Sequence, residues 1–362
     1  MRFPEFTERW DTYRIADILC IGNGRDYKHL SKGDIPVFGT GGYMTSVNEC
    51  LYEGETTFIG RKGTINKPFY YNGKFWTVDT LFYTHSFKRV IPKFVYCLFQ
   101  TINWLRYNEA SGVPSLSKDT IEKIKVRIPQ LDEQKKIAKL LSLLDERIAT
   151  QNKIIEDLKK LKSAIIDYAI NSLDTDFAKF GSLYETAGEG GTPTTSNTSF
   201  YDNGKIPFVK IDDLKQKYLT ENKDFITELG LQKSSAWLVP TRSILFSNGA
   251  SIGEITITTY PVCTKQGILG IVPKSNIDVE FLYYFMSSTY FKKAISRIVT
   301  EGTMKTAYLK DINNILCPIP TKEKQQGIAK MPSDLNSKID YEQSLLKLFI
   351  MQKQYLLRQM FI

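Results

Sequence analysis

The chain has 362 residues, 42% of them hydrophobic, and its 48 basic and 39 acidic side chains give a net charge of +9. This length suffices for two domains with hydrophobic cores, and no apolar run approaches the ~18 residues that span a membrane. The basic excess weakly favours a polyanionic partner. The five cysteines are scattered, and the first residues lack the apolar segment of a signal peptide. We therefore expect a cytoplasmic protein whose cysteines are reduced and used in packing.

The first third of the chain combines strand-like and helix-like segments. β-Branched and aromatic residues predict strands at 56–59 and 77–83. Helical spacing of apolar residues predicts a helix over 92–107. A turn at 111–114 precedes a short strand that ends at Ile128-Pro129.

A long amphipathic helix is predicted over 131–172. Pro129 lies just before it and Asp132-Glu133 occupy its first turn, as is typical of a helix start. At ~1.5 Å per residue this helix is ~60 Å long. A seam of mostly apolar positions alternates in steps of four and three residues, which is the pattern of a coiled coil. The seam positions are Ile137, Leu141, Leu144, Ile148, Gln151, Ile155, Leu158, Lys162, Ile165 and Ala169.

The second half of the chain repeats the first. Residues 128–138 and 319–329 share Ile-Pro, a glutamine (Gln134 and Gln325) and Ile-Ala at an offset of 191. Earlier blocks repeat at smaller offsets, 171 between 33–38 and 204–209, and 187 between 63–65 and 250–252. A repeat of this length indicates two tandem domains with insertions between anchored blocks. Loops that differ on a shared scaffold are where recognition usually resides.

The second long helix repeats the apolar seam of the first. Two polar seam positions recur, as Gln151/Glu342 and Lys162/Lys353. Pro332 takes the place of Leu141, and its missing N–H predicts a kinked or split helix. The repeated seam residues are Ile328, Leu335, Ile339, Glu342, Leu346, Phe349, Lys353, Leu356 and Met360.

The connectivity predicts an α+β fold of two tandem, pseudo-repeated mixed α/β domains joined by two long antiparallel coiled-coil helices. The expected borders are 1–130 and 173–320 for the two domains, and 131–172 and 321–362 for the helices. This arrangement would place two heads at opposite ends of a two-helix rod. The alternative is that each helix packs only on its own head.

Known catalytic motifs are absent. The two histidines, His29 and His85, have no Ser or Cys nucleophile motif and no metal-binding partner motif beside them. There is no phosphate-binding P-loop, and the Gly-rich segments 22–24 and 39–42 are interpreted as simple turns. Asn66-Lys67-Pro68-Phe69 only superficially resembles the catalytic loop of amino-methyltransferases. The sequence therefore predicts a protein that binds and positions, with no catalytic or metal site.

Taken together, these motifs resemble the DNA-specificity subunit of type I restriction–modification systems, over nearly the whole chain. The repeated entry to each long helix is the most diagnostic piece. It is accompanied by Gly190-Gly191-Thr192-Pro193 before 204–209 and Asp212-Asp213-Leu214, and by 60–65 before 75–83. The set occurs in order, and its combination is more specific than any single piece.

The resemblance implies two target-recognition domains that each bind half of a bipartite site in double-stranded DNA. It implies two methyltransferase (modification) subunits as partners, motor–nuclease restriction subunits that join for restriction, and no membrane. The chain itself would be non-catalytic and bind no cofactor, since S-adenosylmethionine, ATP and Mg would belong to the partner subunits.

Candidate DNA contacts are basic and polar residues on loops. In the first domain they are Arg61, Lys62, Thr64, Lys67 and Lys74. In the second domain they are Thr192, Thr194, Thr195, Ser196, Lys210, Asn248, Lys265 and Gln266. The residues expected to form the helix pair and the partner interface are Ile137, Leu144, Ile148, Ile155, Leu158, Ile328, Leu335, Ile339, Leu346 and Phe349.

Two other function classes stay open at this point. The chain could be a coiled-coil scaffold whose heads bind proteins, or the recognition portion of a DNA methyltransferase or nuclease. Salt-dependent binding to duplex DNA would separate the scaffold from a DNA-binding protein.

Overall fold

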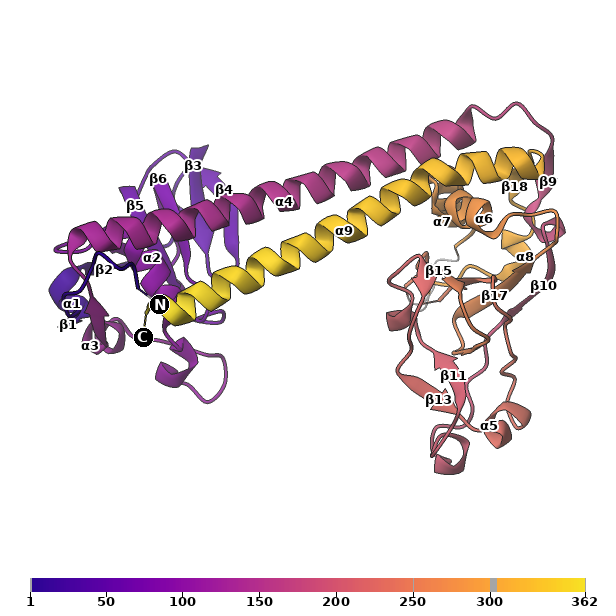
Figure 1. Cartoon of the computed structure of the whole chain (residues 1–362), viewed down its shortest axis with the longest axis horizontal. Helices are drawn as coiled ribbons and strands as arrows, with labels where there is room; N and C mark the ends of the chain where they lie inside the picture. Colours follow the sequence, from indigo (N-terminus) through magenta and orange to yellow (C-terminus); the bar gives the residue numbers. More distant parts are fainter. Residues whose placement is uncertain (1, 250, 300–304, 362) are drawn as a thin grey trace. The chain divides into compact units, whose positions relative to one another are not determined.

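The computed structural model describes residues 2–249, 251–299 and 305–361. The chain divides into two compact units, Met1–Lys153 with Gln343–Ile362, and Ile154–Glu342. Each unit contains one head and segments of both long helices, α4 (Leu131–Asn171) and α9 (Lys322–Met360) (Figure 1). The predicted α+β class with two heads and two long helices is confirmed. The borders expected at residues 130, 172 and 320 stay predictions, because the units are defined by packing and divide both helices.

The first head contains a six-stranded, mostly antiparallel sheet and a separate pair of strands. Its strands are β1 (Asp11–Arg14), β2 (Cys20–Asn23), β3 (Lys32–Gly39), β4 (Gly42–Val47), β5 (Tyr52–Gly60), β6 (Phe69–Thr77), β7 (Leu81–His85) and β8 (Lys125–Ile128). Its helices are α1 (Ile15–Ile18), α2 (Pro92–Thr101), the 3-10 helix η1 (Trp104–Tyr107) and α3 (Lys118–Lys123). The six-stranded sheet has the order β2-β7-β5-β6-β3-β4, and β1 pairs separately with β8.

The second head distributes its strands over more sheets. The strands are β9 (Phe177–Lys179), β10 (Tyr184–Glu189), β11 (Ile206–Val209), β12 (Tyr218–Leu219), β13 (Asp224–Ile226), β14 (Ile244–Ser247), β15 (Ile255–Thr258), β16 (Cys263–Thr264), β17 (Ile268–Pro273) and β18 (Leu316–Pro318). The helices are η2 (Phe180–Ser182), η3 (Thr198–Phe200), η4 (Ile211–Asp213), α5 (Glu228–Gln232), α6 (Val279–Ser287), α7 (Thr289–Ile298) and α8 (Leu309–Ile312). The larger sheet has the order β10-β17-β14-β15-β12, the second sheet has β13-β11-β16, and β9 pairs with β18.

The sequence repeat is also a repeat of strand register. Phe58 pairs with Tyr83 between β5 and β7, and the residues 187 positions later, Leu245 and Gly270, pair between β14 and β17. The parallel pairing of β3 with β6 recurs as β11 with β16. Both heads therefore share one strand framework, as the offsets predicted.

Two elements expected in the first head are shorter than predicted. The strand expected over 77–83 is broken by a turn in which the Leu81 amide donates to the Val78 carbonyl at 3.0 Å. The helix expected over 92–107 ends at Thr101, because the buried Trp104 turns back and its indole N–H donates to the Phe99 carbonyl at 2.8 Å. Tertiary packing overrides the local pattern at both places.

In each head one helix packs between the sheet and the long helices. The core of the first unit joins Ile59 of β5, Leu98 of α2, Leu141 of α4 and Leu357 of α9. The core of the second unit joins Phe246 of β14, Leu282 of α6, Ile170 of α4 and Ala329 of α9. A continuous core of this kind anchors the long helices to each head.

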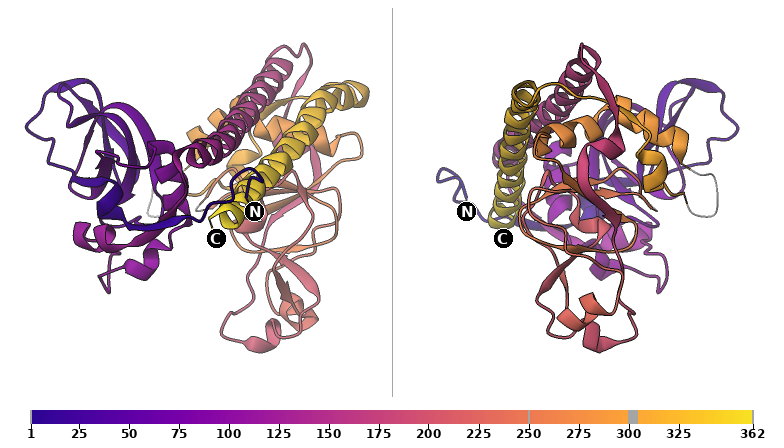
Figure 2. Two further views of the ribbon diagram at one scale, coloured as in Figure 1. Left: turned by 60° about the vertical axis from the view of Figure 1, so that its left-hand side comes forward. Right: turned by 90° about the vertical axis from the view of Figure 1, so that its right-hand side faces the viewer.

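Described residues near both ends of the chain, such as Phe3 and Phe361, pack against the same core in the first unit, where Figure 2 shows the first and last segments near one another. The Phe361 ring lies 5.8 Å from that of Trp10 and 5.4 Å from that of Phe94, measured between ring centroids. One aromatic cluster thus joins two residues from the first third of the chain with one that directly follows α9.

The long helices run antiparallel within the first unit, where Asp145 contacts Lys353 and Arg147 contacts Phe349. Most seam positions are covered to some degree. Ile137, Leu144, Ile155, Ile339 and Phe349 are buried, whereas Ile148, Leu158, Ile328, Leu335 and Leu346 are half-buried. Ile148 and Leu158, which were expected in the helix pair or the partner interface, are thus only partly covered by this chain. Helix α9 is continuous through Pro332, so the proline does not split it.

The repeated glutamine explains the repeated motif. Gln134 is buried, accepts a hydrogen bond from the Ile91 amide at 3.0 Å and donates to the carbonyls of Arg89 and Pro129. In the second head, Gln325 makes the same three kinds of bond, accepting from the Asp278 amide and donating to the carbonyls of Asn276 and Pro320. Each glutamine ties the start of a long helix to the start of the head helix, α2 or α6.

Three cysteines are packing residues, as predicted, and two are not. Cys97, Cys263 and Cys317 are buried, and burial raises the pKa of the Cys97 thiol to about 12 and that of Cys263 to about 11. Cys20 and Cys50 are exposed, so the packing interpretation was wrong for them. Among the described residues, no helix is long and apolar enough to cross a membrane.

Candidate DNA interface

Arg61 and Lys62 follow β5 on a loop that the backbone fixes from two sides. The Arg61 amide donates to the Thr80 carbonyl at 2.8 Å, and the Arg61 carbonyl accepts from the Leu116 amide at 2.9 Å. The Gly63 amide donates to the Pro114 carbonyl at 2.9 Å, and Gly63 has a φ of 84°, which favours glycine. We call residues 61–64, 78–80 and 114–116 the first loop cluster.

The polar side chains of Arg61, Lys62, Thr64 and Asp79 in this cluster are exposed. Arg61 donates from Nη1 to the Asp79 carbonyl at 3.3 Å, and its guanidinium carbon lies 5.8 Å from the Phe82 ring centroid. These contacts orient the guanidinium and leave most of its donors available. Lys62, Thr64 and Lys67 are exposed on the same loop. The predicted residues from Arg61 to Lys67 are therefore brought together.

Lys74 is not on this loop: it lies on β6, where an acidic residue of β5 is its neighbour. It pairs with Glu53 across β5 and β6, with 3.8 Å between Nζ and the carboxylate. The adjacent pair Gly54 and Gly73 both have a φ of 141°. The positive charge of Lys74 is partly compensated by Glu53.

The second head holds an equivalent set of loops. The Asn248 amide donates to the Gly267 carbonyl at 3.0 Å, and the Asn248 carbonyl accepts from the Ala307 amide at 2.9 Å. We call residues 248–249, 251–252, 265–267 and 305–307 the second loop cluster. Residue Ala250, which the repeat matched to Gly63, lies outside the described residues.

Arg61 and Asn248 occupy the same structural position. Their two backbone partners, Thr80 and Leu116 in one head and Gly267 and Ala307 in the other, match at the offsets of 187 and 191. The scaffold thus fixes the main chain identically and leaves the side chain free to differ.

Asn248 differs from the expectation that it offers its amide to DNA. The side chain is 2% exposed, and its Nδ2 donates to the Ala307 carbonyl at 3.2 Å. An amide used in this way cannot reach a base without rearrangement. The exposed polar groups among the described residues of this cluster are instead Ser251, Lys265, Gln266 and Lys305.

Other predicted residues of the second head lie around this cluster. The Thr192 hydroxyl accepts from the Gln266 amide at 3.3 Å, and the Lys265 amide donates to the carbonyl of Val209, the neighbour of Lys210. Lys210 is half-buried and pairs with Asp224 at 2.8 Å. Thr194, Thr195 and Ser196 are exposed on the loop after β10.

The sequence analysis did not predict that an acidic residue lies in the second loop cluster or that a hairpin lies beside the first. Glu189 accepts from the Gly267 amide at 3.0 Å, so a carboxylate lies within the second cluster. In the first head, Thr40 lies at the tip of the β3–β4 hairpin, and its Oγ1 is 3.9 Å from the place a Cβ on Gly63 would take. The Gly-rich segment 39–42 was the available signal, but it was interpreted only as a turn.

Comparison with known proteins identifies the family. Residues 7–160 and 174–348 match the model of the type I restriction modification DNA specificity domain. The specificity subunit of the type I restriction enzyme MjaIX from Methanocaldococcus jannaschii is 26% identical over 70% of this chain and 66% of its own length. The putative MjaX specificity subunit of the same organism is 26% identical over 90% of this chain and 86% of its own length.

A solved structure agrees at the level of the fold. The type I restriction–modification S subunit from M. genitalium covers 100% of this chain and 99% of its own, with a TM-score of 0.63 and 16% sequence identity. Because two copies of the family's domain account for most of the chain, this protein belongs to the DNA-specificity subunits of type I restriction–modification systems.

Proposed function

We propose that the two loop clusters bind the two halves of a bipartite DNA site, one half each. The observation that carries this proposal is the pair Arg61 and Asn248, which have the same backbone hydrogen bonds and different side chains. Around them, Lys62 and Asp79 of the first cluster correspond to Gly249 and Gln266 of the second. Recognition of two unlike half-sites needs such a shared scaffold with different chemistry.

The exposed groups suit the two tasks of a DNA-binding surface. Arg61 can donate two hydrogen bonds to guanine, and Gln266 can pair with adenine through its amide. Lys62, Lys67 and Lys265 suit phosphate contacts, which position the protein without sequence preference. The net charge of +9 favours DNA at long range.

The long helices offer a surface for partner subunits. In the second unit, Ile154, Leu161 and Tyr168 of α4 are exposed and spaced by seven residues. In the first unit, Leu348 and Tyr355 of α9 are exposed with the same spacing, and so is Leu143 of α4. An apolar stripe with this period suits a partner helix. We assign it to two methyltransferase subunits, which would bind S-adenosylmethionine, while ATP and Mg would serve the restriction subunits.

The test is methylation mapping of the assembled complex. Coexpression with the cognate methyltransferase should methylate adenines in a site with two defined halves and an unspecified gap. Replacing residues 184–315 by those of a relative should change one half only. A site without a gap, or a simultaneous change of both halves, would contradict the assignment. DNA binding that does not weaken with salt would favour a protein-binding scaffold instead.

A further inference from the structure

The hairpin of β3 and β4 is short and well defined. Gly39 pairs with Gly42, so only Thr40 and Gly41 form the turn. Gly42 has a φ of 102°, which a side chain would strain. A turn that is followed by a residue with positive φ is a common hairpin connection. The tip is therefore a defined projection of the first head.

Two large apolar side chains at this tip are exposed, Tyr43 at 64% and Met44 at 50%. The register explains how Met44 is placed. Phe38 pairs with Tyr43 and Val37 with Thr45, so Met44 is the extra residue of a β-bulge. Bulges redirect side chains and are frequent beside functional sites. Exposing an aromatic ring and a thioether together at this tip favours a partner that covers them.

The hairpin adjoins the first loop cluster. Thr40 lies beside Gly63, and a Cβ on Gly39 would lie 2.7 Å from Met44 Sδ and 3.5 Å from Val78 Cγ2. Val78 belongs to the cluster that presents Arg61 and Lys62. The apolar tip and the basic loop thus form one surface, on which cationic and apolar groups are neighbours.

Duplex DNA offers the complementary chemistry, because phosphates face cations while base steps accept apolar wedges. Proteins that insert such wedges unstack a step and bend the duplex. We infer that Tyr43 and Met44 form an apolar wedge that stacks against bases at the half-site bound by the first head. This inference rests on the proposed function and adds a contact that distorts the DNA.

In the described part of the second head, the equivalent strands are not joined by a matching two-residue tip. These strands, β11 and β13, pair in the same register but are joined by residues 210–223, which include η4 and β12. The distortion should therefore be confined to one half of the bipartite site. This asymmetry makes the inference testable within a single complex.

The experiment uses the complex with its methyltransferase and a duplex that carries 2-aminopurine at successive positions of both half-sites, except at the methylated adenines, which the methyltransferase itself takes out of the stack. The wild-type complex should raise the fluorescence at one step of one half only. Tyr43→Ala with Met44→Ala should abolish that rise and weaken binding about 5- to 150-fold, the range for one lost stacked base. Tyr43→Phe should retain both, because stacking needs the ring and not the hydroxyl. Leu105→Ala, which removes another exposed apolar side chain of the same head, serves as the matched control and should change neither.

Three outcomes would overturn the wedge. They are a double variant that keeps the fluorescence pattern and the affinity, a Tyr43→Phe variant that behaves like the double variant, and loss of methyltransferase assembly with unchanged DNA binding. The last result would assign the tip to a protein partner. If the wild-type complex binds no specific duplex, the proposed function itself fails, which is a different result from normal binding without the wedge.

Discussion

The two heads close the same pair of strands in different ways. In the first head, β3 and β4 are joined by Thr40-Gly41, which leaves an exposed tip. In the second head, β11 and β13 are joined by residues 210–223, and this longer connection returns to the long helix α9. An insertion at one loop can therefore change what a head does while the strand register stays constant.

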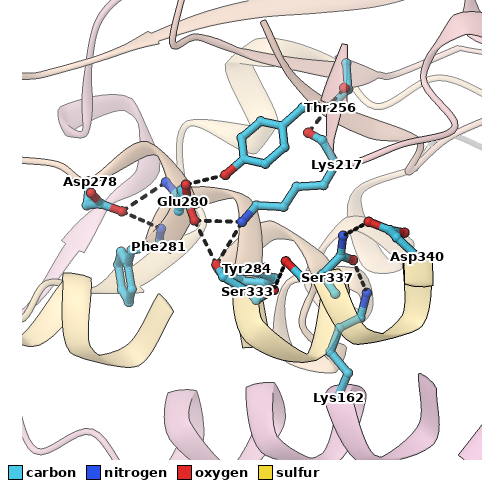
Figure 3. Close-up of polar contacts among 12 residues, drawn as sticks. Lys162, Lys217, Thr256, Asp278, Glu280, Phe281, Tyr284, Ser333, Ser337 and Asp340 are labelled. Carbon is cyan, nitrogen blue, oxygen red and sulfur yellow. Dashed lines mark hydrogen bonds and ion pairs between the residues drawn. The ribbon is translucent and has the colours of Figure 1, made fainter. Parts of the chain in front are cut away.

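Figure 3 shows how the longer connection is used. Lys217, which precedes β12, is buried and donates to Glu280 of α6 at 2.6 Å and to Ser333 of α9 at 2.8 Å. Tyr218 donates to the same carboxylate, and Tyr284 contacts Ser333 at 3.1 Å. The lysine inserted into the head thus fixes the head to the helix beside Pro332.

In the first head the corresponding lysine comes from the long helix and contacts the head. This buried lysine, Lys353, belongs to α9. It donates to the Gln100 side chain at 2.8 Å and to Asp145 of α4 at 2.5 Å. Both heads are therefore fixed by a lysine that lies among aromatic rings, Tyr96 in one case and Tyr218 with Tyr284 in the other. The common requirement is a buried cation with a carboxylate partner.

The largest loss of stability is expected when the buried lysine of the second head, Lys217, is replaced. Lys217→Met leaves Glu280 without its cation and should destabilise the second unit by about 3 kcal/mol. Lys353→Met should cost less, because Asp145 is one-third exposed and can be hydrated. Chemical denaturation of the full chain, followed by hydrogen exchange in each unit, measures both. Equal losses would contradict the comparison.

The same pair predicts a difference in acid. Burial favours protonation of Glu280, but hydrogen bonds from Lys217, Tyr218 and Ser333 outweigh it and keep the pKa below its ordinary value. A depressed pKa contributes stability above the unfolded pKa, and this stability is lost as the pH falls through the folded value. The wild type should therefore lose stability in acid more steeply than Lys217→Met. Parallel stability curves for the two proteins would refute this contribution.

The glutamine clamps should behave alike. Gln134→Leu and Gln325→Leu each leave one amide and two carbonyls without a partner, at an expected cost of about 2–3 kcal/mol. Each variant should increase hydrogen exchange only in its own unit. A marked difference between them would mean that the repeated motif has acquired separate roles.

The loop clusters should separate binding from stability. Arg61→Ala with Lys62→Ala should weaken DNA binding by about 1–3 kcal/mol and leave folding intact, because both side chains are exposed. Asn248→Ala should instead lower stability, since this side chain is buried at the equivalent position. Titrations at several salt concentrations and thermal melts of both variants test this contrast.

The smallest effect is expected at Lys74. Its pair with Glu53 is exposed on both sides, so Lys74→Ala should change stability by less than about 0.5 kcal/mol. A loss of DNA affinity comparable to that of the Arg61/Lys62 variant would place Lys74 at the interface despite its acidic neighbour.

Periodic and repeated features were predictable from the sequence. The seam from Ile137 to Ala169 marked the long helix, and the offsets of 171 and 187 reappear as strand pairs. Three-dimensional contacts decided the rest. Pro332 remains inside a continuous helix, and Asn248 turns inward to a carbonyl that is distant in sequence. The exposure of Tyr43 could not be predicted, because a glycine-rich turn does not show which residues surround it.

The discontinuous first unit has a consequence for folding during synthesis. Residues 154–342 form one uninterrupted stretch, whereas the first unit needs Gln343–Ile362 in addition to the N-terminal residues. Trp10 and Phe94 are synthesised long before Phe361, which packs against both. The head that is translated first can therefore complete its core only after Phe361 has been synthesised and packs against Trp10 and Phe94.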